Sequence, residues 1–307
     1  MSALRCYVQP GGNAASALDV RVARAGLEVV ADPTGADAVV WSSNRPDGLG
    51  ALLARAPAVR WVQLPIAGIE RFVPLVRSHA GPVVWTCAKV AYGPAVAEMT
   101  VGLLITAFRQ LHRYVAARSW QPLRGRVLAG ATVCVLGAGG IGRSLVAQLE
   151  PFGAEVVVVT RSGAPVAGAR VARSEGMTAE IAAADAVVVA VPLTEATTGL
   201  VDRRFLEAMK ESAWLVNVAR GPVVVTDDLV DALRRGVVAG AALDVTDPEP
   251  LPDDHPLWEL ENALVTPHVA NTPALGAAAL GELVEENARR FAGGQPLLGV
   301  VDPLAGY

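Results

Sequence analysis

Residues 132–152 read Thr-Val-Cys-Val-Leu-Gly-Ala-Gly-Gly-Ile-Gly-Arg-Ser-Leu-Val-Ala-Gln-Leu-Glu-Pro-Phe, and this stretch decides the fold. It begins with an apolar, β-branched run over 132–136, which predicts a buried strand. The pattern Gly-x-Gly-x-x-Gly follows directly, and residues 143–152 are then typical of a helix. A second β-branched run comes next, at 155–160. Strand, glycine loop, helix and strand in this order predict a βαβ unit of the dinucleotide-binding type.

Each glycine of the pattern has a physical reason. Gly137 permits the tight turn after the strand, Gly139 lets the backbone approach a pyrophosphate, and Gly142 lets the helix pack closely against the strand. The helix N-terminus adds free N–H groups and a partial positive charge. We therefore expect a cofactor pyrophosphate to lie on this loop, which also contains Gly140 and Ile141. The alternative is a glycine-rich turn that binds nothing.

The residues after the second strand bear on which dinucleotide binds. An NAD site usually has Asp or Glu here, about 20 residues past the loop, to hold the ribose hydroxyls. This chain has Thr160-Arg161-Ser162-Gly163 instead. Arg161 with Ser162 suits a 2′-phosphate, because a guanidinium pairs with phosphate oxygens. The sequence therefore favours NADP(H) over NAD(H); the alternative is a solvated arginine beside an NAD whose ribose is held by other groups.

Further apolar runs alternate with helical patterns along the whole chain. Between residues 131 and 266 they supply about six strands, the number that a complete dinucleotide-binding sheet needs. The first hundred residues show a weaker version of the same pattern. Near-continuous apolar strands separated by helices indicate parallel sheets covered on both faces. The predicted strands lie at 4–8, 28–30, 38–41, 61–64, 83–85, 133–136, 156–159, 187–191, 215–218, 239–245 and 263–265.

Two long helices are predicted to connect the domains. Residues 94–114 have Pro94 at a first helical position and apolar residues at three- to four-residue spacing. Residues 273–291 form the second, which ends at Gly293-Gly294 and carries the chain back to the first domain.

Composition and charge argue against several functions. The net charge of −4 and a pI near 5.6 disfavour a nucleic-acid or acidic-membrane surface. The most apolar stretch, 101–108, is far shorter than the ~20 residues that span a bilayer. Cys6, Cys87 and Cys134 lack CxxC spacing and leave an odd number, which disfavours a disulfide framework or a zinc site. We therefore expect a cytoplasmic protein with no metal and no nucleic-acid or membrane partner.

Three charged or titratable side chains follow predicted strands on their carboxyl side, where ligands bind in open α/β sheets: Arg220, Glu249 and His268. Taken singly, each has an ordinary explanation, as a surface arginine, an acid in an acidic loop and a buried histidine. Together they meet the needs of 2-oxo acid reduction. A histidine donates the proton, a carboxylate orients it, and a guanidinium binds the substrate carboxylate and polarises its carbonyl. Spacing alone does not show that the three converge.

Five stretches carry a resemblance to a known family. Over essentially its whole length, the chain resembles the D-isomer-specific 2-hydroxyacid dehydrogenases. The order and spacing of the matching stretches are specific, so that chance agreement of all five is negligible. The stretches are 135–142, 191–200, 217–221, 242–252 and 266–270.

The resemblance implies a role for each residue of the site. His268 would donate the proton, with Glu249 as its carboxylate partner and Arg220 as the substrate-binding arginine. Backbone N–H groups at about Ala67 and Gly68 would hold the substrate carboxylate. The further cofactor-binding residues implied are Val191 and Pro192 near the adenosine, Val218 and Ala219 along the nicotinamide, Asp244 at the nicotinamide carboxamide, and Thr197.

The resemblance also implies an architecture of two doubly wound parallel-sheet α/β domains. A Rossmann NAD(P)-binding domain, 94–273, would be inserted in a smaller flavodoxin-like substrate domain made of 1–93 and 274–307. The protein would be a homodimer with contacts from about 111–127, where His112 and Trp120 fit interface packing better than catalysis.

Within the family, Thr160-Arg161-Ser162 resembles the glyoxylate and hydroxypyruvate reductases that use NADPH. The sequence thus predicts hydride transfer between NAD(P)H and a small 2-oxo acid or D-2-hydroxy acid, with His268 as proton donor. Alternatives are same-fold enzymes for other substrates, such as phosphoglycerate, phosphite or formate. The formate type pairs its histidine with glutamine, so Glu249 weighs against it. A dinucleotide-sensing binding protein with little turnover would keep the same three residues, and the sequence leaves it open.

Overall fold

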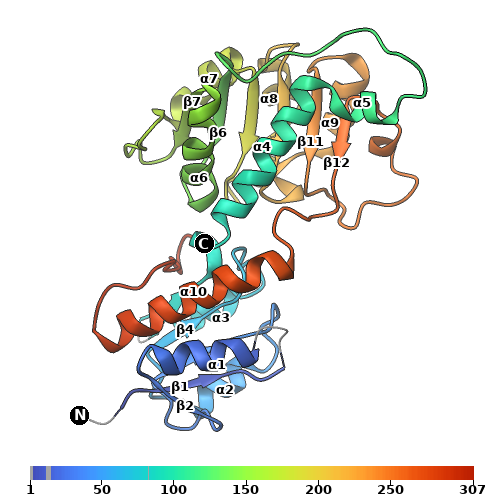
Figure 1. The fold of residues 1–307 in the computed structure, drawn as a ribbon. Coiled ribbons are helices and arrows are strands. Elements are labelled where there is room, and N and C mark those ends of the chain that lie inside the picture. Colours follow the sequence, from blue (N-terminus) through green and yellow to red (C-terminus); the bar gives the residue numbers. More distant parts are fainter. Residues whose placement is uncertain (1–2, 12–14, 82) are drawn as a thin grey trace. The chain divides into compact units, whose positions relative to one another are not determined.

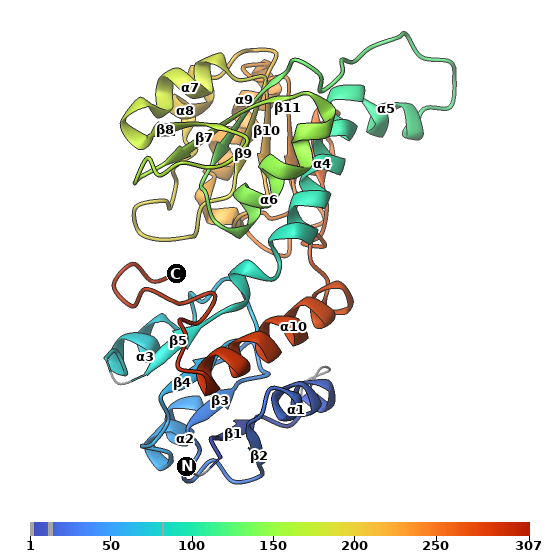
Figure 2. The same cartoon turned by 60° about the vertical axis from the view of Figure 1, so that its left-hand side comes forward.

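The chain divides into two compact units in the computed structural model, which describes residues 3–11, 15–81 and 83–307. Unit 1 comprises Met1–Tyr92 and Pro273–Tyr307, and unit 2 is the continuous segment Gly93–Thr272. Unit 2 is therefore inserted in the sequence of unit 1. Each unit has its own parallel sheet with helices on both faces (Figures 1 and 2).

Unit 1 contains a five-stranded parallel sheet in the order β2-β1-β3-β4-β5, which is the flavodoxin-like order. Helices α1 and α10 pack together over one face, where Leu18, Val22 and Val284 are buried (Figure 1). Helices α2 and α3 bury Leu49 and Val76 in the core on the other face. The strands are β1 (Arg5–Val8), β2 (Glu28–Val30), β3 (Ala38–Val40), β4 (Trp61–Gln63) and β5 (Val84–Thr86); the helices are α1 (Ala15–Arg24), α2 (Leu49–Arg55), α3 (Val73–Ser78), η1 (Ala88–Val90) and α10 (Pro273–Ala292).

Unit 2 contains a seven-stranded parallel sheet in the order β12-β11-β10-β9-β6-β7-β8. Val133 and Val135 of β6 face the core beneath α4 and α6, whereas Cys134 and Leu136 face the core beneath α7, α8 and α9. The strands are β6 (Thr132–Leu136), β7 (Glu155–Thr160), β8 (Arg170–Arg173), β9 (Ala186–Val189), β10 (Trp214–Asn217), β11 (Gly240–Leu243) and β12 (Ala263–Val265). The helices are α4 (Gly93–Arg109), α5 (Leu111–Ala116), α6 (Gly140–Leu149), η2 (Glu150–Phe152), η3 (Ser174–Gly176), α7 (Met177–Ala183), α8 (Arg203–Ala208), η4 (Gly221–Val223), α9 (Thr226–Arg235) and η5 (Pro256–Trp258).

The strand order of unit 2 fixes where a ligand can bind. The neighbours of β6 are β7 and β9, so the chain winds outward from β6 in both directions. In such sheets the ligand site lies beyond the carboxyl ends of the strands at this reversal. The predicted fold class, two doubly wound parallel sheets with the Rossmann-type sheet inserted, is confirmed.

Two details of the prediction are wrong. Unit 2 has seven strands rather than about six, because Arg170–Arg173 forms the edge strand β8 beside β7. Its sequence, Arg-Val-Ala-Arg, has polar ends and only partly buried residues in its centre, so it lacks the apolar run that marks the inner strands.

The helix predicted over 94–114 is two helices. Helix α4 ends at Arg109, and Gln110 adopts a left-handed conformation with φ 55° before α5 begins. The turn places His112 and Arg113 of α5 against the Glu261 region: the His112 ring nitrogen Nε2 lies 3.1 Å from the Glu261 carbonyl oxygen, and Arg113 forms an ion pair with the Glu261 carboxylate. These contacts between distant parts of the chain redirect a segment whose local pattern continues unbroken.

In the part of the chain that the structure describes, no helix combines the length and apolarity needed to cross a membrane.

Candidate active site

The glycine loop joins β6 to α6 at the reversal of strand order. Gly137 has φ +107°, a conformation that residues with a side chain rarely adopt, and its N–H donates to the Val159 carbonyl oxygen at 2.9 Å. A Cβ on Gly142 would lie 2.1 Å from the Gly137 carbonyl oxygen, so this close contact of loop and helix excludes any side chain. A Cβ on Gly139 would meet nothing within 4 Å, which leaves open space on that side of the loop. The loop therefore fits a pyrophosphate, with Gly140 and Ile141 in the first turn of α6, where backbone N–H groups lack helical partners.

The end of β7 carries the two residues predicted to select the dinucleotide. Arg161 and Ser162 are both exposed. The turn is held by its own side chains, because the Gly163 N–H donates to Thr160 Oγ1 at 2.9 Å and the Ala164 N–H donates to Ser162 Oγ at 3.2 Å. This turn contains a guanidinium and a hydroxyl and no carboxylate. It lies where dinucleotide-binding sheets of this kind hold the adenosine ribose of the cofactor.

The loop after β9 contains three further residues predicted to bind the cofactor, Val191, Pro192 and Thr197. The Thr197 hydroxyl donates to the Pro192 carbonyl oxygen at 2.6 Å and accepts from the Thr194 N–H at 2.8 Å. These bonds close the loop on itself at the carboxyl end of β9, next to β6 in the sheet. In this arrangement Thr197 shapes the loop, and its contact with a cofactor stays a prediction.

Asn217 organises the turn that leads to Arg220. It is the last residue of β10 and almost fully buried, at 1% exposure. Its side-chain amide donates to the Arg220 carbonyl oxygen at 3.0 Å and accepts from the Ala219 N–H at 3.0 Å. The side chains of Val218 and Ala219 are themselves buried in the core, so a cofactor along this turn would meet mainly backbone. Sequence reasoning assigned no role to Asn217; a polar residue at the end of an otherwise apolar strand was the available signal.

Asp244 organises the turn that carries His268. Asp244 is 2% exposed, and its carboxylate accepts hydrogen bonds from Thr266 Oγ1 at 2.7 Å, the Val269 N–H at 3.0 Å and the Ala270 N–H at 3.0 Å. The Asp244 carbonyl oxygen also accepts from the His268 N–H at 2.9 Å. A carboxylate has about four acceptor positions, so one is left for a ligand amide. The predicted contact of Asp244 with the nicotinamide carboxamide stays a prediction.

His268 and Glu249 form a hydrogen-bonded pair. The imidazole Nδ1 lies 2.7 Å from Glu249 Oε1, and the two side chains are 46% and 43% exposed. His268 has φ 52°, in the left-handed region that non-glycine residues rarely occupy. The carboxylate holds the ring through Nδ1, and no described residue forms a hydrogen bond with Nε2. The arrangement is that of a histidine oriented by a carboxylate for proton transfer at Nε2.

The loop that carries Glu249 rests directly on the turn that carries Arg220. A Cβ on Gly221 would lie 1.8 Å from the Thr246 carbonyl oxygen, so the two backbones touch where only glycine fits. The Arg220 guanidinium also donates to the Ala219 carbonyl oxygen at 2.7 Å. The tertiary structure thus joins the segments that carry Arg220, Glu249 and His268 at the carboxyl edge of one sheet.

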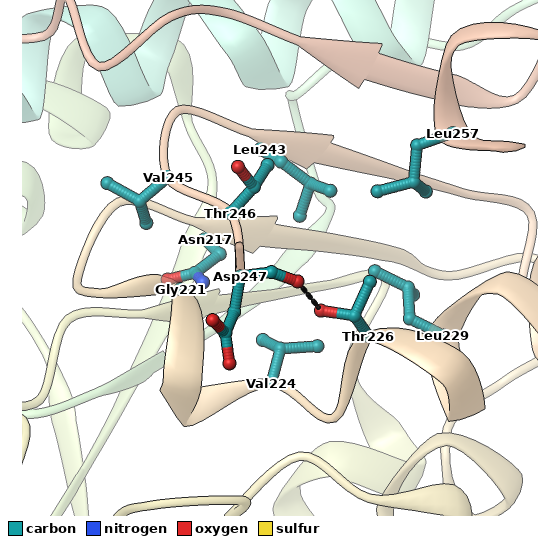
Figure 3. A pocket seen from close by; sticks show the side chains of 10 residues that line it. All are labelled: Asn217, Gly221, Val224, Thr226, Leu229, Leu243, Val245, Thr246, Asp247 and Leu257. Atoms are coloured by element: carbon teal, nitrogen blue, oxygen red, sulfur yellow. Dashed lines mark hydrogen bonds between the residues drawn. The ribbon is translucent and has the colours of Figure 1, made fainter. Parts of the chain in front are cut away.

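A small, mainly apolar pocket lies under these loops. Figure 3 shows Val224 and Leu229 facing Leu243 across it, and the Thr226 hydroxyl donating to the Asp247 carbonyl oxygen at 2.7 Å. This bond fastens the start of α9 to the loop before Glu249. The pocket belongs to the scaffold of the site, because its lining is the packed underside of the two loops.

The predicted substrate loop lies in unit 1, after the carboxyl end of β4. Ala67 and Gly68 are half-buried there, next to the buried Ile69. The Tyr92 hydroxyl donates to the Pro65 carbonyl oxygen at 2.5 Å, and burial raises the pKa of Tyr92 to about 12, so the hydroxyl remains a donor at neutral pH. These contacts hold the loop in place. Binding of a substrate carboxylate by Ala67 and Gly68 stays a prediction.

Fold and site together define a class of protein. A glycine loop at the reversal of a doubly wound sheet is the dinucleotide-binding arrangement, and an imidazole held by a carboxylate at the same sheet edge can exchange a proton with a substrate. A nucleotide cofactor and a proton donor side by side are what a nicotinamide-dependent oxidoreductase needs.

Comparison with known proteins gives the family. The family model for "D-isomer specific 2-hydroxyacid dehydrogenase, NAD binding domain" matches residues 100–270. The chain therefore belongs to the D-isomer specific 2-hydroxyacid dehydrogenase family and is an NAD(P)-dependent oxidoreductase. The resemblance stated from the sequence is confirmed.

Relatives extend over most of the chain. A Corynebacterium melassecola protein, called "Uncharacterized protein in proB 3′region", is 41% identical over 298 residues, which are 92% of this chain and 93% of the relative. The Homo sapiens "Glyoxylate reductase/hydroxypyruvate reductase" is 38% identical over 224 residues, 68% of each chain. A crystal structure of a D-isomer specific 2-hydroxyacid dehydrogenase from Xanthobacter autotrophicus Py2, in complex with NADPH and MES, superposes with a TM-score of 0.84 at 29% identity and covers 100% of both chains.

Proposed function

We propose that this protein reduces a small 2-oxo acid, such as glyoxylate or hydroxypyruvate, to the 2-hydroxy acid, with the D configuration where the product has a stereocentre. The observation that carries the proposal is the 2.7 Å hydrogen bond between His268 Nδ1 and Glu249 Oε1. The Homo sapiens relative, whose name is that of a reductase for these two acids, supports the substrate class.

The residues of the site divide the reaction between them. Bound NADPH supplies the hydride. His268 donates its Nε2 proton to the carbonyl oxygen, which becomes the hydroxyl oxygen of the 2-hydroxy acid. Glu249 keeps the imidazole in place through Nδ1 and stabilises the charge of the protonated ring. Arg220 binds the substrate carboxylate and polarises the carbonyl, a task that suits its planar, permanently charged guanidinium.

We also propose that NADP(H) is the preferred cofactor. The turn after β7 presents Arg161 and Ser162 and no carboxylate, which favours a 2′-phosphate over free ribose hydroxyls. The NADPH complex of the Xanthobacter autotrophicus protein supports this preference.

The reaction is tested by steady-state kinetics with glyoxylate and hydroxypyruvate, each with NADPH and NADH, and by chiral chromatography of the product formed from hydroxypyruvate, which has a stereocentre. Replacement of His268 by glutamine should lower kcat by about a hundredfold or more, because general acid catalysis contributes roughly 10²–10⁴-fold. NADPH affinity and the thermal unfolding midpoint should stay unchanged. Near-normal turnover of the His268→Gln protein would refute the assignment. Tight NADPH binding by the unmodified protein without turnover would instead indicate a dinucleotide sensor.

We further propose a homodimer built on the segment 111–127. Three of its apolar side chains are strongly exposed: Trp120 at 95%, Leu123 at 91% and Val115 at 80%. Figures 1 and 2 both show the connection from α5 to β6 standing away from the rest of unit 2. A monomer rarely leaves so much apolar surface in water.

A cytoplasmic location fits the three free, buried cysteines.

The dimer is tested by sedimentation velocity. Leu123→Glu should shift the protein to the monomer, whereas Leu304→Glu, at a residue that is 89% exposed in unit 1, should not. A monomeric unmodified protein would refute the dimer.

A further inference from the structure

The edge strand β8 brings a second arginine to the turn that selects the dinucleotide. Arg173 is the last residue of β8 and pairs in register with Thr160, the last residue of β7. Both strands run parallel, so Arg173 lies at the carboxyl edge of the sheet, where the turn with Arg161 and Ser162 begins. Because β8 lacks the apolar pattern of a buried strand, the sequence did not predict that Arg173 lies next to this turn.

The Arg173 side chain lies across the turn. A Cβ built on Gly163 would be 3.0 Å from both Arg173 Cγ and Arg173 Nε, and 3.6 Å from its Cδ. The stem and the start of the guanidinium therefore occupy the space that the missing side chain of Gly163 leaves. Gly163 also has φ +65°, which favours glycine at this position. A glycine here lets a long cationic side chain fold over the turn.

The charge of Arg173 is available to a ligand, in contrast to that of its neighbour in the strand. Arg170 is bound by both carboxylate oxygens of Glu180, at 2.7 and 2.6 Å. Arg173 is exposed, and no hydrogen bond or ion pair joins its guanidinium to any residue that the structure describes. The two arginines of this short strand therefore have different surroundings: Arg170 fixes the strand to α7, and Arg173 lies across the turn at Gly163.

We propose that Arg173 is a specificity-determining residue that binds the 2′-phosphate of NADP(H) together with Arg161 and Ser162. The inference rests on the proposed use of NADP(H). A phosphate monoester carries nearly two negative charges at neutral pH and three acceptor oxygens. One guanidinium satisfies at most two of these oxygens in its bidentate geometry, and a second guanidinium with a hydroxyl completes the set. NAD(H) has no such group, so Arg173 should affect the affinity for NADP(H) alone.

The test is the dissociation constant for NADPH and for NADH, measured by isothermal titration calorimetry without substrate. Arg173→Ala should weaken NADPH binding by about tenfold or more, as expected for loss of a charge-assisted hydrogen bond, and leave NADH binding within about twofold. Arg173→Gln, which keeps the first part of the stem and a polar end without the charge, should show the same selectivity and guards against a packing defect. Arg161→Ala should act in the same direction.

Arg234→Ala is the matched control. Arg234 is an exposed arginine in the last turn of α9, near the amino ends of the strands and therefore away from the turn of Arg161. Its removal should change neither affinity. Equal weakening of NADPH and NADH by the Arg173 variants would overturn the inference, because it would mean that Arg173 only supports the strand. Unchanged NADPH affinity would overturn it as well. If the unmodified protein binds NADH more tightly than NADPH, the cofactor proposal fails and the inference fails with it. If instead the unmodified protein only lacks reductase activity, the ratio of its NADPH and NADH affinities still tests the role of Arg173.

Discussion

Replacement of Gly221 by alanine adds one methyl group where the segments that carry Arg220 and Glu249 touch. The new Cβ would lie 1.8 Å from the Thr246 carbonyl oxygen, 2.2 Å from its carbonyl carbon and 2.7 Å from the Asp247 nitrogen. All three are backbone atoms, so no side-chain rotation relieves the clash. Arg220 precedes Gly221 directly, and Glu249 follows Asp247 by two residues. The methyl group therefore acts at once on two residues that we propose to be catalytic.

The size of the effect follows from the displacement. An ordinary contact begins at 3.4 Å, so the two backbones must separate by roughly 1.5 Å. A misplacement of about 1 Å at a catalytic group can cost a hundredfold in rate. We expect kcat/KM to fall by about a hundredfold or more, which is roughly 2.7 kcal/mol of lost transition-state stabilisation. Overpacking should also lower the free energy of unfolding by about 1–3 kcal/mol.

The assay is kcat/KM for glyoxylate with NADPH, together with NADPH affinity and urea unfolding. Gly102→Ala is the control, because Gly102 is exposed in the middle of α4 and a Cβ there meets nothing within 4 Å. That change should leave kcat/KM unaltered and slightly stabilise the helix. If Gly221→Ala retains kcat/KM within about threefold and unfolds like the unmodified protein, the close contact does not position the site and the reasoning is refuted.

Three further predictions concern stability, loop order and the thiols. Burial alone would raise the pKa of Asp185, but hydrogen bonds from a backbone N–H, a lysine and an arginine outweigh it and hold the pKa below its ordinary value of 3.8. Asp185→Asn should therefore cost about 1–3 kcal/mol of unfolding free energy at pH 6. The difference between variant and unmodified protein should shrink as the pH falls below 3.8, since the contribution of a carboxyl with a depressed pKa is lost on protonation; a difference that does not depend on pH would contradict this. Asp244→Asn should lower both stability and kcat, because an amide NH₂ would face backbone donors that now meet a carboxylate oxygen; unchanged kcat would show that the network does not position the histidine. Burial raises the pKa of the Cys6 and Cys134 thiols to about 12 and raises that of Cys87. Iodoacetamide at pH 8 should thus leave the native protein unmodified and alkylate all three thiols after denaturation, and rapid alkylation of the native state would disprove the burial.

Local features of the chain were predictable wherever neighbours in sequence make the structure. The pattern of residues 132–152 predicts the strand, the loop and the helix together. The close contact between Gly137 and Gly142 also lies within this stretch. Edge strand β8 was not predictable, because it has no apolar pattern of its own. It is a strand because it pairs with β7. The break at Gln110 escaped prediction for the same reason, since the contacts that redirect α5 come from Glu261, far along the chain.

The sequence by itself determined the chemistry that is available: the glycine loop, the absence of an acid after β7, and the residue types Arg220, Glu249 and His268, each just beyond an apolar strand. Only the tertiary structure decided which of these groups meet. It placed His268 Nδ1 at 2.7 Å from Glu249, buried Asp244 and Asn217 under the loops as their organisers, and brought Arg173 onto the turn of Arg161. The physical reason is that a strand pattern fixes burial but not partners, whereas parallel pairing in register brings the carboxyl ends of distant segments to one edge of the sheet.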